Sequence, residues 1–138
     1  MSAAWVIDAS VGFAWVHPDQ ATLETDKLLK EVESGATVVV PGLWFLEIAN
    51  GLLVLQRRKK LTAEDRKSAL ATLARLNPAV DEESNKAVFQ KTSELAEKHG
   101  LTVYDATYLE LALRRKLPLA SRDEPLRAVA KKCGLRVL

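Results

Sequence analysis

Short, wholly apolar runs alternate along this chain with longer segments in which apolar residues recur at helical spacing. The apolar runs fit strands that are buried on both faces, because such strands read as continuous apolar stretches. Strands that alternate with helices build βαβ units, whose strands run parallel. The pattern therefore predicts an α/β fold, a three-layer α/β/α domain with a mainly parallel, five-stranded sheet.

Prolines, glycines and capping residues set the expected boundaries of these elements. Strands are expected at residues 4–7, 36–40, 79–81, 117–120 and 135–138. Helices are expected at residues 10–16, 19–34, 43–58, 63–76, 84–100, 104–115 and 124–133.

Length and composition narrow the classes of protein. A chain of 138 residues, 48% of them hydrophobic and 28% charged, fits one domain over residues 1–138 and is not typical of a disordered chain. Cys133 is the only cysteine, so no internal disulfide can form, which favours a cytoplasmic location. No apolar run approaches the roughly 20 residues that span a bilayer, and the N-terminal stretch lacks the basic segment of a signal peptide.

Two aspartates follow predicted strands, Asp8 directly and Asp123 after a short turn, whereas charged stretches such as 81–83 read as solvated faces without a function. Asp8 follows the first strand and Asp123 follows the strand at 117–120. The carboxyl ends of parallel strands are where α/β proteins bind ligands. The alternative is that each aspartate caps the next helix, with Ser121 competing for the cap at Asp123.

Two further acids lie on helices and are expected to face the protein interior. Glu47 borders the apolar stripe of its helix, and a carboxylate that half faces a core is costly unless it is paired or bound to metal. The alternative for Glu47 is a side chain that reaches outward to solvent. Asp105 shares a face with Tyr108 and Leu109. The helix dipole would explain its place in the first turn but not its inward direction.

Strand ends and the adjoining helices meet at one rim of a parallel sheet, so we expect the four carboxylates in one pocket. They would repel one another unless a cation compensated their charge. Mg²⁺ prefers oxygen ligands, and Mn²⁺ accepts similar ones. Zinc is not favoured, because His17, His99 and Cys133 show no ligand spacing.

Four sequence motifs carry a resemblance to a known family. They are residues 6–10 around Asp8, 41–50 around Glu47, 104–112 around Asp105, and 119–123 ending at Asp123, with serine where threonine is common. In this order and in these structural contexts they resemble the motifs of PIN-domain nucleases. The likeness is closest to the VapC-type toxins of bacterial and archaeal toxin–antitoxin pairs, and it covers essentially the whole chain.

The resemblance implies a PIN-like fold and an Mg²⁺- or Mn²⁺-dependent endoribonuclease that acts as the toxin of a type II toxin–antitoxin system. It implies a cognate antitoxin whose C-terminal segment covers the acidic pocket, and it favours a homodimer. The four acids agree with the family pattern, so the resemblance implies an active enzyme. The sequence selects no particular RNA target.

The four acids are expected to share the catalytic work. As a hypothesis, Asp8 and Asp105 bind the metal ion, and Asp123 and Glu47 contact it directly or through water. The ion lowers the pKa of a bound water, whose proton a neighbouring carboxylate accepts, and it stabilises charge on the scissile phosphate.

Four other polar residues are candidates for positioning substrate or water: Ser10, Asn50, Ser121 and Arg122. Ser10 and Ser121 would hold a metal-bound water or a phosphate oxygen. Arg122 lies on the expected catalytic rim and is the preferred RNA contact. Three basic clusters instead close predicted helices, where cations complement the helix dipole. These clusters are residues 57–60, 114–116 and 131–132.

Two other classes of protein stay open at this stage. A phosphohydrolase of the haloacid-dehalogenase type also begins with a strand that ends in aspartate, but it needs a second acid where this chain has Ser10. A non-catalytic module that binds nucleic acid or protein would use the acids only as helix caps. Such a module predicts that divalent metal has no specific effect.

Overall fold

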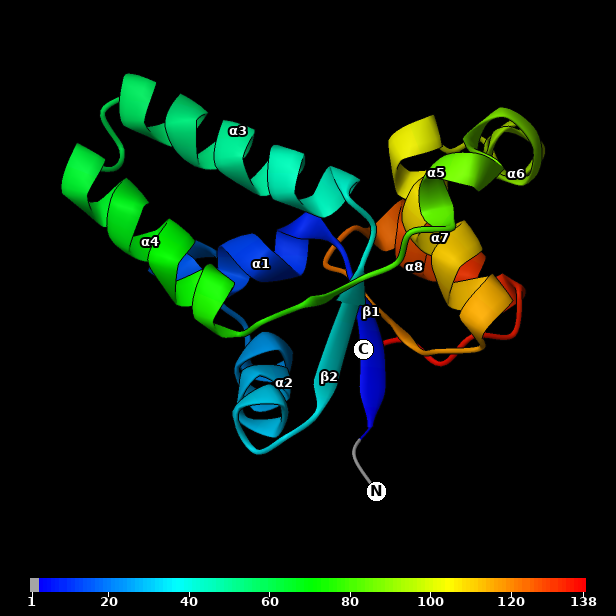
Figure 1. Cartoon of the computed structure of the whole chain (residues 1–138), viewed down its shortest axis with the longest axis horizontal. Helices are drawn as coiled ribbons and strands as arrows, with labels where there is room; N and C mark the ends of the chain where they lie inside the picture. Colours follow the sequence, from blue (N-terminus) through cyan, green and yellow to red (C-terminus); the bar gives the residue numbers. More distant parts are fainter. Residues whose placement is uncertain (1–2) are drawn as a thin grey trace.

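The structure, a computed structural model, describes residues 3–138. Residues 1 and 2, part of the stretch expected to lack a signal-peptide segment, lie outside the described residues. A parallel sheet with the strand order β3–β2–β1–β4 forms the centre of the molecule (Figure 1). Its strands are β1 (Ala4–Ile7), β2 (Thr37–Val40), β3 (Ala79–Val80) and β4 (Leu119–Ala120).

Helices cover both faces of this sheet. In Figure 1, helices α1–α4 lie on one side of the sheet and helices α5–α8 lie on the other. The predicted three-layer α/β/α arrangement with a parallel sheet is therefore confirmed. The helical segments are α1 (Ala9–Val16), η1 (Pro18–Gln20), α2 (Leu23–Glu33), α3 (Leu43–Arg57), α4 (Ala63–Arg75), α5 (Ser84–Ala87), η2 (Val88–Thr92), α6 (Ser93–His99), α7 (Val103–Arg115) and α8 (Glu124–Lys132). None of the helices within residues 3–138 combines the length and apolarity needed to cross a bilayer.

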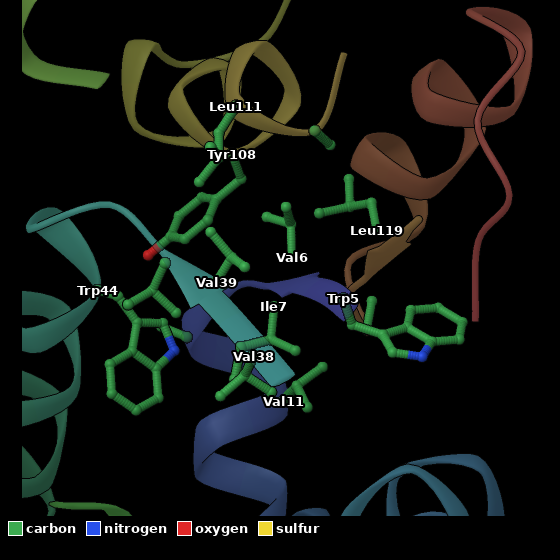
Figure 2. Packing of buried hydrophobic residues seen from close by; sticks show 14 of the residues in the cluster. Trp5, Val6, Ile7, Val11, Val38, Val39, Trp44, Tyr108, Leu111 and Leu119 are labelled. Carbon is green, nitrogen blue, oxygen red and sulfur yellow. The ribbon is translucent and has the colours of Figure 1, made fainter. Parts of the chain in front are cut away.

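The core lies between the two helical layers, because the central strands carry apolar side chains on both faces. Val6 and Ile7 are completely buried. Figure 2 shows Val6 on the side of the sheet that faces Tyr108, and Ile7 on the side that faces Val11. Alternating residues of one strand thus contribute to both layers of the core, as expected for a strand covered by helices on both sides.

The predicted fifth strand at 135–138 is reduced to a single β-bridge between Leu119 and Val137. The main-chain N–H of Leu119 donates to the carbonyl of Arg136 at 3.0 Å, and its carbonyl accepts from the N–H of Leu138 at 3.3 Å. Strand β4 has only two residues, and only Leu119 forms a β-bridge with the segment at 135–138. The prediction of five strands is wrong by this element: the described chain has a four-stranded sheet with one added bridge.

Two predicted helices differ from the structure in their extent. The helix predicted at 84–100 is interrupted by the π-helical segment η2, where Oγ of Ser93 donates to the carbonyl of Val88 at 2.6 Å. A π turn accommodates one more residue than an α turn. The helix predicted at 19–34 begins later, because a 3₁₀ turn precedes it and Thr22 caps α2.

Helices α1 and α3 pack closely because each presents a glycine to the other. A Cβ atom on Gly12 would lie 2.6 Å from Cδ1 of Ile48, and one on Gly51 would overlap the ring of Phe13. Larger side chains at these two positions would force the helices apart. The glycines therefore allow α3 to lie directly against α1.

Candidate active site

The site lies at the carboxyl ends of β1 and β4, where the order of the strands reverses. The chain passes from β1 outward through β2 to β3, and then crosses to β4 on the other side of β1. Such a switch point leaves a crevice at the strand ends, where α/β proteins bind ligands. Asp8 follows β1 directly and Ser121 follows β4 directly, and the N–H of Asp8 donates to the carbonyl of Ala120 at 3.1 Å.

Asp8 is held by hydroxyl groups on both of its carboxylate oxygens. Oγ of Ser10 donates to Oδ1 and Oγ of Ser121 donates to Oδ2, each at 2.5 Å. Oδ1 also accepts from the N–H of Val11 at 3.4 Å, so Asp8 caps α1 as well. The side chain is 5% exposed. Capping and a role in the site are therefore compatible at this position.

The two serines also fix the loop that follows β4. The main-chain N–H of Arg122 donates to Oγ of Ser10 at 2.8 Å, and that of Asp123 donates to Oγ of Ser121 at 3.0 Å. Each hydroxyl thus accepts from the loop and donates to Asp8. The contacts tie residues 121–123 to the end of β1, and the role of the serines in holding water or phosphate stays a prediction.

Burial of the Asp8 carboxyl changes its acidity. Loss of solvent raises its pKa to about 6, from an ordinary value of 3.8, although the hydrogen bonds from Ser10, Ser121 and Val11 oppose this effect. The negative charge of Asp105 raises the pKa further. A carboxyl group with this pKa takes up a proton as the pH falls through about 6, whereas a bound cation would favour its ionised form.

Glu47 contacts a buried tyrosine. The hydroxyl of Tyr108, on α7, donates to Oε1 of Glu47, on α3, at 2.5 Å. Figure 2 shows the Tyr108 ring crossing the core with its oxygen directed toward α3. Burial raises the pKa of Glu47, the hydrogen bond from Tyr108 lowers it, and the charge of Asp105 raises it. Helical spacing predicts that Tyr108 faces the interior but does not reveal this contact, although a buried tyrosine hydroxyl usually finds a partner.

A second contact ties the start of α3 to β1. The indole Nε1 of Trp44 donates to the carbonyl of Asp8 at 3.2 Å. Trp44 is 2% exposed, so its ring belongs to the core while its N–H reaches the backbone of the site. Since Glu47 lies one turn later on the same helix, this hydrogen bond helps to set its distance from Asp8.

Asp105 lies in the first turn of α7, and Asp123 immediately precedes α8, both on the other side of the sheet. Burial raises the pKa of Asp105, and the charge of Asp123 raises it further. Oδ2 of Asp123 accepts from the N–H of Leu126 at 3.0 Å, so Asp123, and not Ser121, caps α8. Both predicted acids are therefore half-buried at helix starts.

Asp105 interacts electrostatically with each of the other three acids. Its charge raises the pKa of Asp8 and of Glu47, and the charge of Asp123 raises the pKa of Asp105. The donor set consists of carboxylate oxygens and fits Mg²⁺ or Mn²⁺. Within residues 3–138, no three His, Cys, Asp or Glu side chains form a ready-made metal site. The fit therefore rests on the donor chemistry and on the shared negative charge.

The remaining candidates lie at the surface. Asn50 is exposed on α3, one turn after Glu47. Arg122 is exposed, and its guanidinium donates to Oε1 of Gln20 at 3.4 Å. Beside it lies a pocket of about 240 Å³ whose lining includes Ser121 and Arg122. The positioning roles of Asn50 and Arg122 stay predictions.

The reading of residues 81–83 as a solvated face is wrong for Asp81. This side chain is 8% exposed and accepts two hydrogen bonds from Arg114, at 2.6 and 3.1 Å, and one from Ser84 at 2.6 Å. Arg114 also bonds Glu110 at 2.8 Å. A polar network thus joins the end of β3 to α7, and it occupies the guanidinium of Arg114.

Comparison with known proteins shows related chains of similar length. The family model described as the PIN domain matches residues 5–132. The chain is 31% identical over 121 residues to Ribonuclease VapC3 of Pyrobaculum aerophilum, covering 88% of this chain and 90% of that protein. It is 32% identical over 118 residues to Ribonuclease VapC9 of Mycobacterium tuberculosis, covering 86% and 84%.

Solved structures share the fold. The crystal structure of PAE2754 from Pyrobaculum aerophilum matches with a TM-score of 0.72 and 24% identity, over 99% of this chain and 90% of that chain. That of VapBC2 from Rickettsia felis, bound to a DNA fragment from their promoter, matches with a TM-score of 0.67 and 13% identity, over 98% and 97%. The resemblance found in the four motifs is thus confirmed, and the chain belongs to the PIN-domain family.

Proposed function

We propose that this protein is a divalent-metal-dependent endoribonuclease and the toxin of a type II toxin–antitoxin pair. Membership of the PIN-domain family supports this function, as do relatives named as VapC ribonucleases. The observation that carries the proposal is the electrostatic coupling of Asp105 to the other three acids at the strand ends. A bound cation would stabilise the ionised forms of carboxylates that repel one another.

The acids have distinct proposed roles. Asp8, Asp105 and Asp123 would hold Mg²⁺ or Mn²⁺, and Glu47 would contact it directly or through water. When bound, the ion acts as a Lewis acid that lowers the pKa of water and offsets charge on the phosphate. Ser10 and Ser121 keep Asp8 in one orientation through its two oxygens.

Glu47 is our proposed proton acceptor. Its Oε1 is taken by the hydroxyl of Tyr108, so the proton would go to Oε2. Burial raises the pKa of Glu47, which makes it a better base than a solvated carboxylate. Arg122 and Asn50, exposed beside the site, would contact the RNA.

The exposed apolar residues next to the acids favour a protein partner. Leu46 precedes Glu47 and is 71% exposed, and Val103, two residues before Asp105, is 39% exposed. Apolar side chains that gather around a polar site commonly mark an interaction surface. We propose that a cognate antitoxin covers them together with the acids, that the toxin forms a homodimer, and that it acts in the cytoplasm as a single-domain chain.

Incubation of the purified, partner-free protein with total RNA tests the activity. One arm contains Mn²⁺ or Mg²⁺ and the other contains EDTA, and each is repeated with Asp8→Asn. Asp65→Asn makes the same chemical change at an exposed position on α4 and serves as the matched control. We expect cleavage by the wild type and by Asp65→Asn with metal only, and none by Asp8→Asn.

Equal activity of wild type and Asp8→Asn would show that Asp8 serves only as the cap of α1 and would contradict its role in catalysis. Cleavage that persists in EDTA would contradict the metal requirement. The same arms decide against the binding-module alternative, which predicts no effect of metal in any variant.

A further inference from the structure

Two tyrosines lie one turn apart on α7, in opposite surroundings. Tyr104 is 62% exposed, whereas Tyr108 is 1% exposed and ends in a hydroxyl group 2.5 Å from Oε1 of Glu47. Apart from Tyr108, the described residues provide Glu47 with no hydrogen-bond donor or salt-bridge partner. A side chain from the helical layer on one face of the sheet thus contacts an acid from the layer on the other; Figure 2 shows the Tyr108 side of this contact.

Glu47 has physical reasons to turn away from the site. It is only partly buried, at the border of the apolar stripe of α3, and water is available on its outer side. Burial raises the pKa of Glu47, and the negative charge of Asp105 adds to that rise, so both disfavour the ionised side chain within the site. A long acidic side chain at such a border gains hydration by extending outward. The hydrogen bond from Tyr108 opposes that movement.

Tyr108 is suited to this task because it stays a donor. Burial and the neighbouring carboxylate Glu47 raise its pKa well above the ordinary value. Its ring is fixed by the core, so the hydroxyl occupies one place and loses little conformational freedom on bonding. A hydrogen bond to an ionised acceptor is stronger than one between neutral groups.

We infer that Tyr108 is a positioning residue, which holds Glu47 in the active site through Oε1 and leaves Oε2 for metal-bound water. This inference rests on the proposed function, because it assigns a task to Tyr108 within the same site. It says more than that Tyr108 fills the core, since a phenylalanine would fill the same space without holding Glu47.

The test compares Tyr108→Phe with Tyr104→Phe, the same change one turn earlier on the same helix. Mn²⁺ binding is measured by isothermal titration calorimetry in the absence of RNA, and kcat and KM are measured on one RNA substrate. Residues that orient metal ligands typically contribute about 10–100-fold to affinity or activity. We expect Tyr108→Phe to lower kcat and Mn²⁺ affinity by about that range, with KM for RNA little changed. Tyr104→Phe should match the wild type in kcat and Mn²⁺ affinity.

A double-mutant cycle with Glu47→Gln separates positioning from general stability. If Tyr108 acts through Glu47, adding Tyr108→Phe to Glu47→Gln should produce no further loss of kcat or Mn²⁺ affinity, since coupled residues are not additive. Additive losses would overturn the inference. So would a Tyr108→Phe protein that has a lower Tm but wild-type Mn²⁺ affinity and kcat.

The wild-type arm keeps the two proposals distinct. A wild type that binds Mn²⁺ with unchanged affinity in Tyr108→Phe would overturn the role of Tyr108 and leave the metal site in place. A wild type that binds no Mn²⁺ would overturn the proposed function, and with it the positioning role. Binding without cleavage would contradict the nuclease, while the calorimetric comparison would still decide the role of Tyr108.

Discussion

The hydroxyl group of Ser121 donates a 2.5 Å hydrogen bond to Oδ2 of Asp8, from a position 113 residues further along the chain. Both residues directly follow parallel strands that lie side by side in the sheet. The pairing of β1 with β4 therefore brings the two side chains together. The hydrogen bond from Ser121, at the end of β4, fixes the orientation of the Asp8 carboxylate at the end of β1.

Replacing Ser121 with alanine should weaken both the fold and the site. Ser121 is 2% exposed, and its hydroxyl serves Asp8 and the N–H of Asp123. Leaving such buried groups without a partner costs about 1–3 kcal/mol. Urea denaturation measures this cost, and the RNA assay measures the loss of activity. Ser68→Ala, an exposed serine on α4, should leave both unchanged; an equal effect of the two substitutions would refute the role of Ser121.

Stability of the metal-free protein should depend on the ionisation of Asp8. Burial raises its pKa to about 6 in the folded state, so the folded protein holds this proton more tightly than the unfolded chain does. The ionised carboxyl therefore opposes folding above pH 6, by about 3 kcal/mol, and this loss disappears as the pH falls toward 4. Asp8→Asn removes the effect.

Chemical denaturation at several pH values, in EDTA, measures the difference between wild type and Asp8→Asn. The variant should be the more stable protein at pH 7.5, and the difference should shrink as the pH falls from 6 to 4. Saturating Mn²⁺ should stabilise the wild type more than the variant. A difference that does not change with pH would contradict the prediction.

Gly51→Ala should destabilise the packing of α1 against α3. The added Cβ would overlap the ring of Phe13, and overpacking of a core commonly costs about 1–3 kcal/mol. Gly42→Ala is the matched control, because no atom lies within 4 Å of its Cβ position and its φ of −57° suits alanine. Thermal unfolding should separate the two variants, and similar Tm values for both would argue against close packing at Gly51.

Arg114→Met should destabilise the protein, because it breaks the polar network at the end of β3. The change keeps the aliphatic stem but removes the guanidinium that contacts the buried carboxylates of Asp81 and Glu110, leaving Asp81 with only the more distant Arg115 as its cation. Breaking such a buried pair costs roughly 3 kcal/mol, reduced here by the partial exposure of Arg114. Arg115→Met is the control: its guanidinium lies 3.7 Å from Asp81 and is more exposed, so we expect less than about 1 kcal/mol.

The same network gives a second check through pH. Burial alone would raise the pKa of Asp81, but hydrogen bonds from Arg114 and Ser84 and the charge of Arg114 lower it overall. Its contribution to stability is therefore present at neutral pH and is lost as the pH falls below about 4. The gap between wild type and Arg114→Met in urea should narrow in acid.

The sequence was sufficient to predict that Asp105 lies close enough to Asp8, Glu47 and Asp123 to interact with their charges; their roles in catalysis stay predictions. Asp8 follows an unbroken apolar strand, and a parallel sheet places all such strand ends on one rim. Asp105 stands out because it shares a helical face with apolar residues. These inferences need only the spacing of apolar residues along the chain and the parallel sheet that this spacing predicts.

The contacts that orient the acids were not predictable in the same way. The bonds of Ser121 to Asp8 and of Tyr108 to Glu47 join residues far apart in sequence, and they depend on rotamers and on the exact placement of helices. Asp81 was misread because its neighbours in sequence are charged, whereas its partner Arg114 lies on another helix. The predicted fifth strand at 135–138 is only a single β-bridge, because the neighbouring strand β4 has just two residues.

The spread of the site along the chain governs when the protein can become active. Asp8 is synthesised well before Asp123 and its helix α8, because more than a hundred residues separate them along the chain. Contacts between distant parts of a chain form late in folding, since a long intervening segment must first be ordered. The proposed nuclease would therefore be harmless while it is being synthesised, and a single proteolytic cut that releases α8 would silence it.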